Sequence, residues 1–400
     1  MNYRRIADLD VSGKRLLVRA DLNVPLQDGV VTDATRITRF ADGMRPLLDK
    51  GASLVVLTHF GRPKGRVKPE MSVGQVRDAL AKALGRDVDF TPDCIGPEAV
   101  SKATALSDGT VLLCENLRFH PQEEDNDPSF AAALAELGDI YVNDAFSCAH
   151  RAHASTAALA HLRPAYVGPL MIEELDALQS ALEMPKAPSV AIVGGAKVSS
   201  KIAVLKNLVS KVDHVIIGGG MANTFLFADG APMGTSLHEP DQLEIVGEIQ
   251  DRAAKTGCQL HLPRDVVAAT EFAAMAPHKV IPADACPQEM MILDAGPQAV
   301  EDFKSVLDRC NTILWNGPLG AFEMDPFDGA TCALAQKAAD RTKAGAVSVA
   351  GGGDTVAALN HAGVGEEFSY VSSAGGAFLE WLEGKDLPGI AALRNDAELV

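Results

Sequence analysis

Residues 347–355 read VSVAGGGDT and contain the clearest strand-to-helix signal in the chain. Val347–Ala350 is a short apolar run of the kind that forms a parallel strand buried on both faces. The three glycines and Asp354 that follow predict a tight turn into a helix N-terminus, where backbone N–H groups can approach phosphate oxygens. Asp354 is a candidate for capping that helix, for binding a divalent cation, or for both.

The same unit, an apolar run followed by glycine or polar residues and then a helical stretch, recurs along the whole chain. Strands are expected at Leu16–Ala20, Leu54–Leu57, Val111–Cys114, Ile140–Val142, Val190–Val193, His214–Ile217, Gln259–Leu262, Met290–Leu293, Thr312–Trp315, Val347–Ala350 and Ser369–Val371. Short apolar strands alternating with helices predict parallel sheets covered by helices on both faces. The fold class is therefore α/β, with two doubly wound parallel-sheet domains joined by an interdomain helix.

The joining helix is expected at Met171–Glu183, where apolar residues recur at helical spacing and Pro185 and Pro188 end the pattern. A chain of 400 residues is also too long for one ordinary core, so two domains are the expectation.

Composition excludes several classes of protein. The net charge of −17 disfavours nucleic acid and anionic membranes as partners. No apolar run is long enough to cross a bilayer, and residues 1–14 lack the apolar core of a secretory signal. The seven cysteines are scattered and form no CxxC pair, which is typical of reduced thiols in a cytoplasmic protein.

Basic and polar residues follow four successive strands of the first half. The segments are Arg19–Pro25, Thr58–Pro63, Glu115–Phe119 and Asn143–His153. A single arginine at such a place is usually a surface residue, but parallel strands bring all four ends to one edge of the sheet. Guanidinium groups match phosphate and carboxylate geometry. A small anion with a phosphate or carboxylate is therefore expected there, with Asp21 and Asn23 available to a neighbouring hydroxyl.

Glycine clusters follow strands throughout the second half. Besides residues 351–353, they are Gly194–Gly195, Gly218–Gly220, Gly317–Gly320 and Gly375–Gly376. Such clusters are often only tight turns, but several in one domain favour a nucleotide. Lys197 and Lys201 are four residues apart and would share a helix face. Neither a P-loop, GxxxxGK[ST], nor a dinucleotide fingerprint is evident.

Taken together, these motifs resemble those of the phosphoglycerate kinase family, in that family's order and from about residue 16 to residue 390. They are VRADLNVP at 18–25, HFGRP at 59–63, ENLRF at 115–119, AHRAH at 149–153, GGAKV at 194–198, WNGP at 315–318 and GGGDT at 351–355.

The resemblance implies a domain plan. It places a 3-phosphoglycerate-binding domain at residues 1–168, an interdomain helix and linker at 169–186 and a nucleotide-binding domain at 187–387. A C-terminal segment, 388–400, would return to the first domain.

The resemblance also implies residue roles. The residues expected to bind 3-phosphoglycerate or 1,3-bisphosphoglycerate are Asp21, Asn23, Arg36, His59, Arg62, Arg118 and Arg151. Those expected to bind ADP or ATP are Lys201, Gly218, Asn316, Glu323, Gly352, Gly353, Asp354 and Thr355. Arg36, Lys197 and Gly375 would act on the transferring phosphoryl group, and Asp354 would face Mg²⁺.

One segment departs from the family pattern. Residues 372–378 read SSAGGAF, where family members usually read STGGGAS. Ala374 could not adopt a glycine-only backbone conformation cheaply, but it keeps its backbone N–H, so activity is expected to be retained.

The implied reaction is reversible, Mg²⁺-dependent phosphoryl transfer from 1,3-bisphosphoglycerate to ADP, direct and in line, with closure of the two domains. The resemblance also implies a cytoplasmic monomer. Two alternatives are a kinase or ligase acting on another small acid, and a non-catalytic nucleotide sensor. The sensor would be expected to have lost one motif set, whereas Arg36 and Lys197 are both present.

Overall fold

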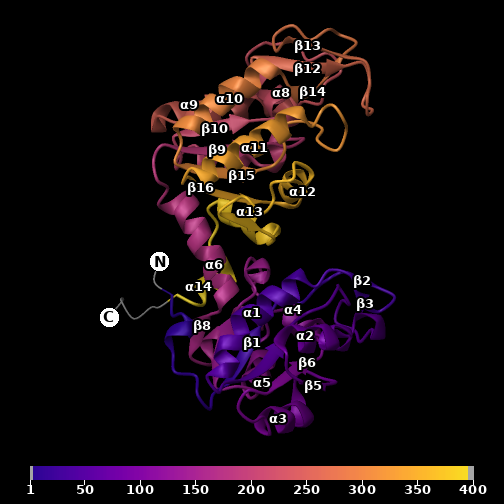
Figure 1. Cartoon of the computed structure of the whole chain (residues 1–400), viewed down its shortest axis with the longest axis vertical. Coiled ribbons are helices and arrows are strands. Elements are labelled where there is room, and N and C mark those ends of the chain that lie inside the picture. The colour runs from indigo at the N-terminus through magenta and orange to yellow at the C-terminus, as the bar shows by residue number, and fades with distance from the viewer. Residues whose placement is uncertain (1–2, 395–400) are drawn as a thin grey trace. The chain divides into compact units, whose positions relative to one another are not determined.

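The strand β1 (Arg15–Arg19) lies at the centre of a six-stranded parallel sheet in the first half of the chain. In the computed structural model, which describes residues 3–394, the chain divides into two compact units. Unit 1 comprises Met1–Glu174 and Asp386–Val400, and unit 2 comprises Leu175–Lys385. The helices and strands of both units are labelled in Figure 1.

Unit 1 has the strand order β5-β6-β4-β1-β7-β8, and all pairs are parallel. Its other strands are β4 (Ser53–Leu57), β5 (Val88–Thr91), β6 (Val111–Cys114), β7 (Ile140–Asn143) and β8 (Ala165–Val167), with a hairpin of β2 (Leu26–Gln27) and β3 (Val30–Val31). Its helices are α1 (Thr35–Asp49), α2 (Arg77–Leu84), α3 (Gly96–Thr104), α4 (Pro121–Glu124), α5 (Pro128–Ala135) and α14 (Pro388–Ala391). Sequence reasoning missed β5, β8 and the hairpin of β2 and β3.

Unit 2 has the parallel order β11-β10-β9-β15-β16-β17. Its strands are β9 (Ser189–Val193), β10 (His214–Ile217), β11 (Gln259–His261), β15 (Thr312–Asn316), β16 (Val347–Gly351) and β17 (Tyr370–Ser372). Its helices are α7 (Ile202–Leu208), α8 (Gly219–Ala228), α9 (Leu243–Thr256), α10 (Pro297–Arg309), α11 (Gly329–Lys343), α12 (Gly353–His361) and α13 (Gly376–Leu382). Two doubly wound parallel sheets confirm the predicted fold class.

One expected parallel strand is not part of either parallel sheet. The run Met290–Leu293 forms β14 (Met291–Ala295), which pairs antiparallel with β12 (Asp265–Ala269), and β12 pairs antiparallel with β13 (His278–Pro282). The run's apolar residues are buried, as in a parallel strand, so composition alone could not tell the two cases apart. This three-stranded sheet supplies one wall of the pocket described below.

The chain passes from unit 1 to unit 2 within α6 (Pro169–Leu178), which continues into a π-helical turn at Gln179–Glu183. At the other end of the chain, Gly389 N donates to Ala149 O at 2.9 Å, and Tyr3 bridges to Arg394. Residues 395–400 of the predicted C-terminal segment lie outside the described residues. The assignment of one substrate to each domain stays a prediction.

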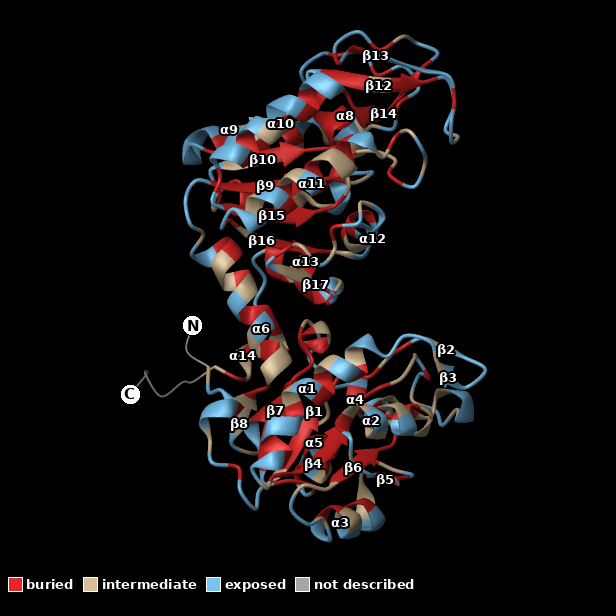
Figure 2. Ribbon diagram, in the orientation of Figure 1, coloured by how far each residue is buried: buried red, intermediate tan, exposed pale blue. Residues whose placement is uncertain are grey.

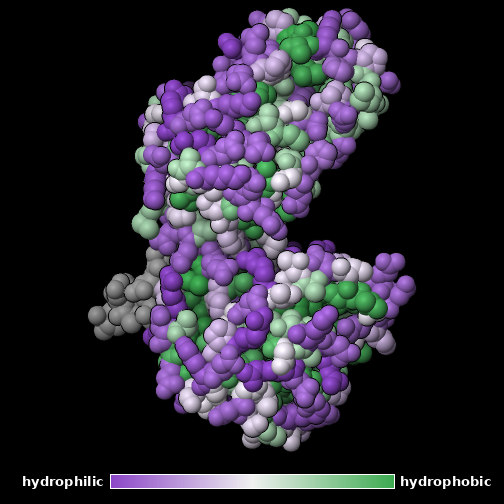
Figure 3. Space-filling view, in the orientation of Figure 1, coloured by the Kyte–Doolittle hydropathy of each residue, from purple (hydrophilic) through white to green (hydrophobic). Residues whose placement is uncertain are grey.

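Burial follows the layers of each unit. The central strands of the two parallel sheets are buried almost throughout, whereas β13 of the antiparallel sheet is mostly exposed and the helices expose their outer faces (Figure 2). The visible surface is mostly hydrophilic, with small apolar areas such as one over the antiparallel sheet of unit 2 (Figure 3). Within residues 3–394, no helix combines the length and apolar character needed to span a membrane.

Candidate functional site

In the unit 1 sheet, the chain leaves β1 toward β4 on one side and leaves β7 toward β8 on the other, so β1 and β7 flank the topological switch point. The polar motifs after these two strands meet there. Asp21, just after β1, accepts hydrogen bonds from Arg36 Nη1 at 2.8 Å and from Ser147 Oγ at 2.5 Å. Burial alone would raise the pKa of the Asp21 carboxyl, but the Arg36 charge and the hydrogen bond from Ser147 lower it overall. Asp21 is therefore a fixed carboxylate at this edge, and Arg36 reaches it from the first turn of α1.

A second set of contacts ties the neighbouring motifs to this edge. Asn23 Oδ1 accepts a hydrogen bond from Gly61 N at 3.0 Å, and Arg118 Nη1 donates to Gly61 O at 3.1 Å. Arg118 also lies 3.5 Å from Glu124. The backbone at Gly61 adopts a φ of 61°, which glycine tolerates. The segments after β1, β4 and β6 therefore converge, as the sequence predicted.

Arg19 is fully buried beneath this cluster, and sequence reasoning did not select it as a site residue. Its Nε donates to Ser155 Oγ at 2.8 Å, and Ser155 Oγ donates to Glu123 Oε1 at 2.6 Å. Burial raises the pKa of the Glu123 carboxyl, although the Arg19 charge opposes the rise. The position of Arg19 two residues before Asp21 was the available signal, but a buried arginine cannot be distinguished from an exposed one by sequence.

The same guanidinium sets the protonation of His59. Arg19 Nη2 lies 3.2 Å from His59 Nδ1, and because a guanidinium can only donate, Nδ1 accepts. Burial and the Arg19 charge hold the pKa of His59 well below its usual value. His59 is therefore a neutral imidazole whose Nε2 carries the proton, which is the form that donates to an anionic ligand.

Two of the predicted anion-site residues are not tied into this cluster. Arg62 and Arg151 are exposed, and Arg151 Nε donates to His150 Nε2 at 3.2 Å. Exposed guanidiniums near a buried polar cluster remain available to a ligand, but their role stays a prediction.

In unit 2 the strand order reverses between β9 and β15, and Lys201 joins the ends of these strands. Its Nζ donates to Gly194 O at 2.7 Å and to Asn316 O at 3.0 Å. Burial lowers the pKa of the Lys201 ammonium to about 8, although Asp354 opposes the shift.

The predicted helix carrying both Lys197 and Lys201 is wrong. Lys197 has an extended backbone, residues Val198–Ser200 form a 3-10 turn, and α7 begins only at Ile202. Lys201 has a non-helical backbone as well, so the two lysines do not share a helix face. The place of Lys197 near a transferring phosphoryl group stays a prediction.

Backbone crowding explains the glycines at this reversal point. A Cβ at Gly194 would lie 1.7 Å from Pro318 O, and one at Gly220 would lie 2.3 Å from Ala196 O. A Cβ at Gly218 would lie 2.4 Å from a Leu319 side-chain carbon. These glycines let three backbone segments pack directly on one another, which a larger residue would prevent.

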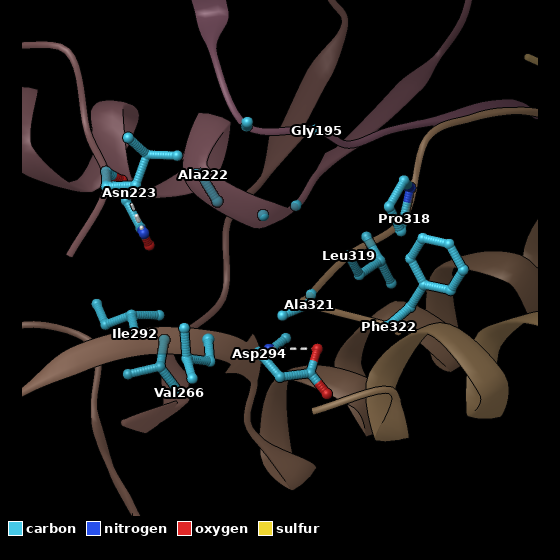
Figure 4. A pocket seen from close by; sticks show the side chains of 18 of the residues that line it. Gly195, Ala222, Asn223, Val266, Ile292, Asp294, Pro318, Leu319, Ala321 and Phe322 are labelled. Atoms are coloured by element: carbon cyan, nitrogen blue, oxygen red, sulfur yellow. Dashed lines mark hydrogen bonds between the residues drawn. The ribbon is translucent and has the colours of Figure 1, made fainter. Parts of the chain in front are cut away.

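Beside these glycines lies a pocket of about 430 Å³, wholly within unit 2. The start of α8 forms one side, the strands β12 and β14 form the opposite side, and the loop from Pro318 to Glu323 closes a third (Figure 4). Val266, Ile292 and Leu319 give much of the lining an apolar character, whereas Asp354 and Glu323 add carboxylates. The size and the mixed lining suit a flat, partly apolar ligand with polar ends.

The structure brings together most of the predicted nucleotide residues. Gly218, Glu323 and Asp354 line the pocket. Asn316 Nδ2 donates to Gly351 O at 2.7 Å, and Thr355 Oγ1 accepts from Gly317 N at 2.7 Å, so both side chains brace the glycine turn.

That turn is built from Gly352 and Gly353. Gly352 has a φ of 102°, and a Cβ at Gly353 would meet nothing within 4 Å. The start of α12 therefore presents open backbone N–H groups, as the sequence predicted.

Gly375 is not among the residues that line this pocket; it precedes α13 with a φ of 53°. The neighbouring Ala374 is not in the left-handed region, and its N–H donates to Ser372 Oγ at 3.2 Å. Phe378 is fully buried, and a Cβ at Gly351 would lie 2.8 Å from its ring. Both departures from the family pattern are therefore accommodated, one by an ordinary backbone and one by core packing.

Asp294 is a pocket residue that sequence reasoning missed. Its carboxylate accepts from Ala295 N at 2.9 Å and from Ala330 N, in the first turn of α11, at 2.8 Å. Burial raises its pKa to about 8. A Cβ at Gly320 would lie 2.2 Å from Asp294 Oδ1, so the carboxylate positions the loop that closes the pocket. Asp294 directly follows the run Met290–Leu293, but this run forms an antiparallel strand, so the rule for the carboxyl ends of parallel strands does not identify it.

Two doubly wound units, one with a basic cluster and the other with a glycine-lined pocket at the reversal of its sheet, are typical of a two-domain α/β enzyme that brings a small anion together with a nucleotide. Comparison with known proteins narrows this class. The family model for phosphoglycerate kinase matches residues 6–385. The chain therefore belongs to the phosphoglycerate kinase family.

Individual relatives agree with this assignment. The chain is 60% identical to a phosphoglycerate kinase of Methylobacterium radiotolerans over 98% of each chain. It is 57% identical to one of Cereibacter sphaeroides, over 98% of this chain and all of the relative. A solved phosphoglycerate kinase structure from Coxiella burnetii superposes with a TM-score of 0.92 at 42% identity, covering 98% of this chain and 99% of the other.

Proposed function

We propose that this protein catalyses reversible phosphoryl transfer between the acyl phosphate of 1,3-bisphosphoglycerate and ADP, giving 3-phosphoglycerate and ATP. The observation that carries the proposal is the presence of both motif sets, each assembled at the reversal point of its own sheet, in a chain of this family. In the direction that consumes ATP, the acceptor of the phosphoryl group is the carboxyl group of 3-phosphoglycerate.

The proposed site for 3-phosphoglycerate lies in unit 1. Arg36, Arg118 and the Nε2–H of His59 supply donors to anionic oxygens, and Asp21 and Asn23 fix the loop that faces the ligand's hydroxyl. Arg62 and Arg151 are the exposed guanidiniums that would complete the phosphate contacts. The neutral state of His59 suits this task, because a second buried positive charge beside Arg19 would be costly.

The proposed nucleotide site lies in unit 2. The pocket between α8 and the antiparallel sheet would take the base, with Gly218 at its wall, and Glu323 would reach the ribose. Lys201, Asn316 and the turn of Gly352, Gly353 and Thr355 would hold the phosphates.

Mg²⁺ fits this arrangement. Asp354 is an exposed carboxylate at the pocket and at the start of α12, and Mg²⁺ in nucleotide sites usually needs one or two carboxylates besides the phosphates. A bound Mg²⁺ would neutralise charge on the nucleotide phosphates. The protein's own contribution there is to orient the phosphates against Lys201 and the α12 backbone.

In the proposed step, an oxygen of the ADP β-phosphate attacks the phosphorus of the acyl phosphate, and the bond from that phosphorus to the carboxyl oxygen breaks. The electron pair of that bond stays on the departing carboxylate of 3-phosphoglycerate. Arg36, Lys197 and the N–H at Gly375 would stabilise the charge on the transferring group. Because the two substrates bind to different units, turnover requires the units to close, which also excludes water. We propose that the protein acts as a cytoplasmic monomer.

The test is a coupled assay with purified protein, 3-phosphoglycerate, ATP and Mg²⁺, in which NADH oxidation by an added dehydrogenase reports 1,3-bisphosphoglycerate. Arg36→Ala is expected to lower kcat by at least about 100-fold, since removal of one transition-state donor costs roughly that much. Absence of turnover in the parent chain, or turnover only with another carboxylic acid, would refute the proposal.

A further inference from the structure

Asp328, Cys332 and His361 form a cluster of three different metal-ligating side chains in unit 2. Asp328 immediately precedes α11, Cys332 lies one helical turn later, and His361 ends α12. One ligand atom from each lies within 4.8 Å of the other two. The cluster does not overlap the lining of the pocket described above.

We propose that this cluster is a binding site for a single Zn²⁺ ion or a similar thiophilic divalent cation. His361 Nε2 lies 2.8 Å from Asp328 Oδ2, and Cys332 Sγ lies 3.6 Å from the same oxygen. In a tetrahedral zinc site with ordinary bond lengths, nitrogen and oxygen ligands lie roughly 3.3 Å apart and sulfur and oxygen ligands roughly 3.6 Å apart. The two distances to Asp328 Oδ2 are therefore within about half an ångström of those of a zinc site, and the His361 and Cys332 ligand atoms lie within 4.8 Å of each other.

The exposure of the three side chains allows an ion to enter. The His361 side chain is 51% exposed and that of Asp328 is 24% exposed. Cys332 is half-buried, whereas the other six cysteines are buried. The site thus has one anchored thiol and an imidazole that can rotate onto the ion.

A second cluster, Asp93, Cys94 and His120 in unit 1, meets the same distance limit but suits an ion less well. Asp93 Oδ1 already accepts from Cys94 N, Ile95 N and His120 Nε2. Cys94 is only 1% exposed, so an ion would have to enter the interior. This cluster serves as a matched control.

The choice of ion follows from the ligands. Thiolate and imidazole select zinc and similar ions over Mg²⁺, which prefers oxygen ligands. The site is also remote from the nucleotide turn, because α12 begins at Gly353 and ends at His361, about 12 Å along the helix axis. A bound ion would link the start of α11 to the end of α12.

The experiment titrates the reduced, metal-free full chain with Co²⁺ alone and records the thiolate-to-cobalt charge-transfer band, followed by displacement with Zn²⁺. The parent chain is expected to bind one equivalent with this band and to show a higher Tm with Zn²⁺. Cys332→Ser should abolish the band. His361→Ala should weaken cobalt binding by more than about tenfold, since removing even a residue that only hydrogen-bonds to a metal ligand weakens metal affinity by about that much. Cys94→Ser should leave both unchanged.

Three results would overturn the proposal. They are no charge-transfer band in the parent chain at millimolar Co²⁺, a band that survives Cys332→Ser, or a band lost in Cys94→Ser. Circular dichroism of each variant separates the loss of a ligand from the loss of the fold.

Discussion

Replacing Asp144 by asparagine is expected to change how the stability of unit 1 depends on pH. Asp144 follows β7, and its Oδ1 accepts from Leu170 N at 2.8 Å and Met171 N at 3.2 Å in the first turn of α6. Its other oxygen, Oδ2, is buried without a hydrogen-bond partner among the described residues. A Cβ at Gly168 would lie 2.3 Å from Oδ1, so the carboxyl is closely enclosed.

The magnitude follows from the pKa of Asp144. Burial raises it from 3.8 to about 7, and Oδ2 can carry the proton without losing a donor. Between about pH 4 and about pH 7 the folded chain therefore retains a proton that the unfolded chain has released, so stability falls as pH rises through this window. A span of about 3 pH units corresponds to at most about 4 kcal/mol. An asparagine keeps the oxygen that caps α6 but does not titrate.

The assay is urea unfolding of the parent and of Asp144→Asn at a series of pH values from about 4 to about 8. Circular dichroism reports both units, whereas tryptophan fluorescence reports unit 2 alone, since Trp315 and Trp381 both belong to it. As pH rises, the unfolding free energy of Asp144→Asn should increase relative to that of the parent by up to about 4 kcal/mol. All other titrating groups are common to the two proteins, so their contributions cancel in this comparison.

The matched control for this assay is Asp127→Asn. Asp127 caps α5, and its hydrogen bond from the Phe130 N–H lowers its pKa, so its contribution is lost only as pH falls below about 4. A constant difference between parent and Asp144→Asn across the whole pH range would refute the reasoning about Asp144.

Three further predictions concern unit 2. Gly194→Ala should destabilise unit 2 by at least about 1–3 kcal/mol and abolish nucleotide binding, because its new Cβ would collide with a backbone oxygen. Gly353→Ala should fold normally, because its new Cβ meets no atom. Urea unfolding and calorimetry with ADP compare the two variants. Lys201→Met should cost about 1–3 kcal/mol in unfolding free energy, because Gly194 O and Asn316 O lose a buried donor; a normal urea midpoint would contradict this. Ala374→Gly should change the unfolding free energy by less than about 1 kcal/mol and leave kcat unchanged. Phe378→Ala should lower the unfolding free energy by about 3–5 kcal/mol. A large gain in kcat from Ala374→Gly would show that the alanine strains the loop.

Sequence reasoning predicted the parallel sheets because each strand leaves a strong local mark. The runs at Leu16–Ala20 and Val190–Val193 are apolar, short and followed by glycine or polar residues, so both the strand and the strand-end site could be inferred. Of the antiparallel sheet, only β14 coincides with a predicted strand, and β12 and β13 were missed. The direction of β14 could not be inferred because it is buried and apolar like a parallel strand, and strand direction is set by which partner lies alongside.

The candidate site shows the same limit. Asp21 and Arg36 could be inferred from motif position, and they do form an ion pair at 2.8 Å. Arg19 and Asp294 escaped because their importance lies in burial and in contacts with residues more than 30 positions away, Ser155 and Ala330 respectively. Long-range packing of this kind leaves no local pattern.

Crossed calorimetric titrations can show whether each substrate binds to its own unit. Arg36→Ala and Lys201→Met would each be titrated with 3-phosphoglycerate and with ADP plus Mg²⁺. Arg36→Ala is predicted to weaken 3-phosphoglycerate binding by at least about tenfold, the loss of one charge-assisted contact, while its Kd for ADP stays unchanged. Lys201→Met is predicted to weaken the binding of ADP and to leave the Kd for 3-phosphoglycerate unchanged. If either variant weakened both ligands equally, or if Arg36→Ala weakened only ADP, the division of the two sites between the units would be contradicted.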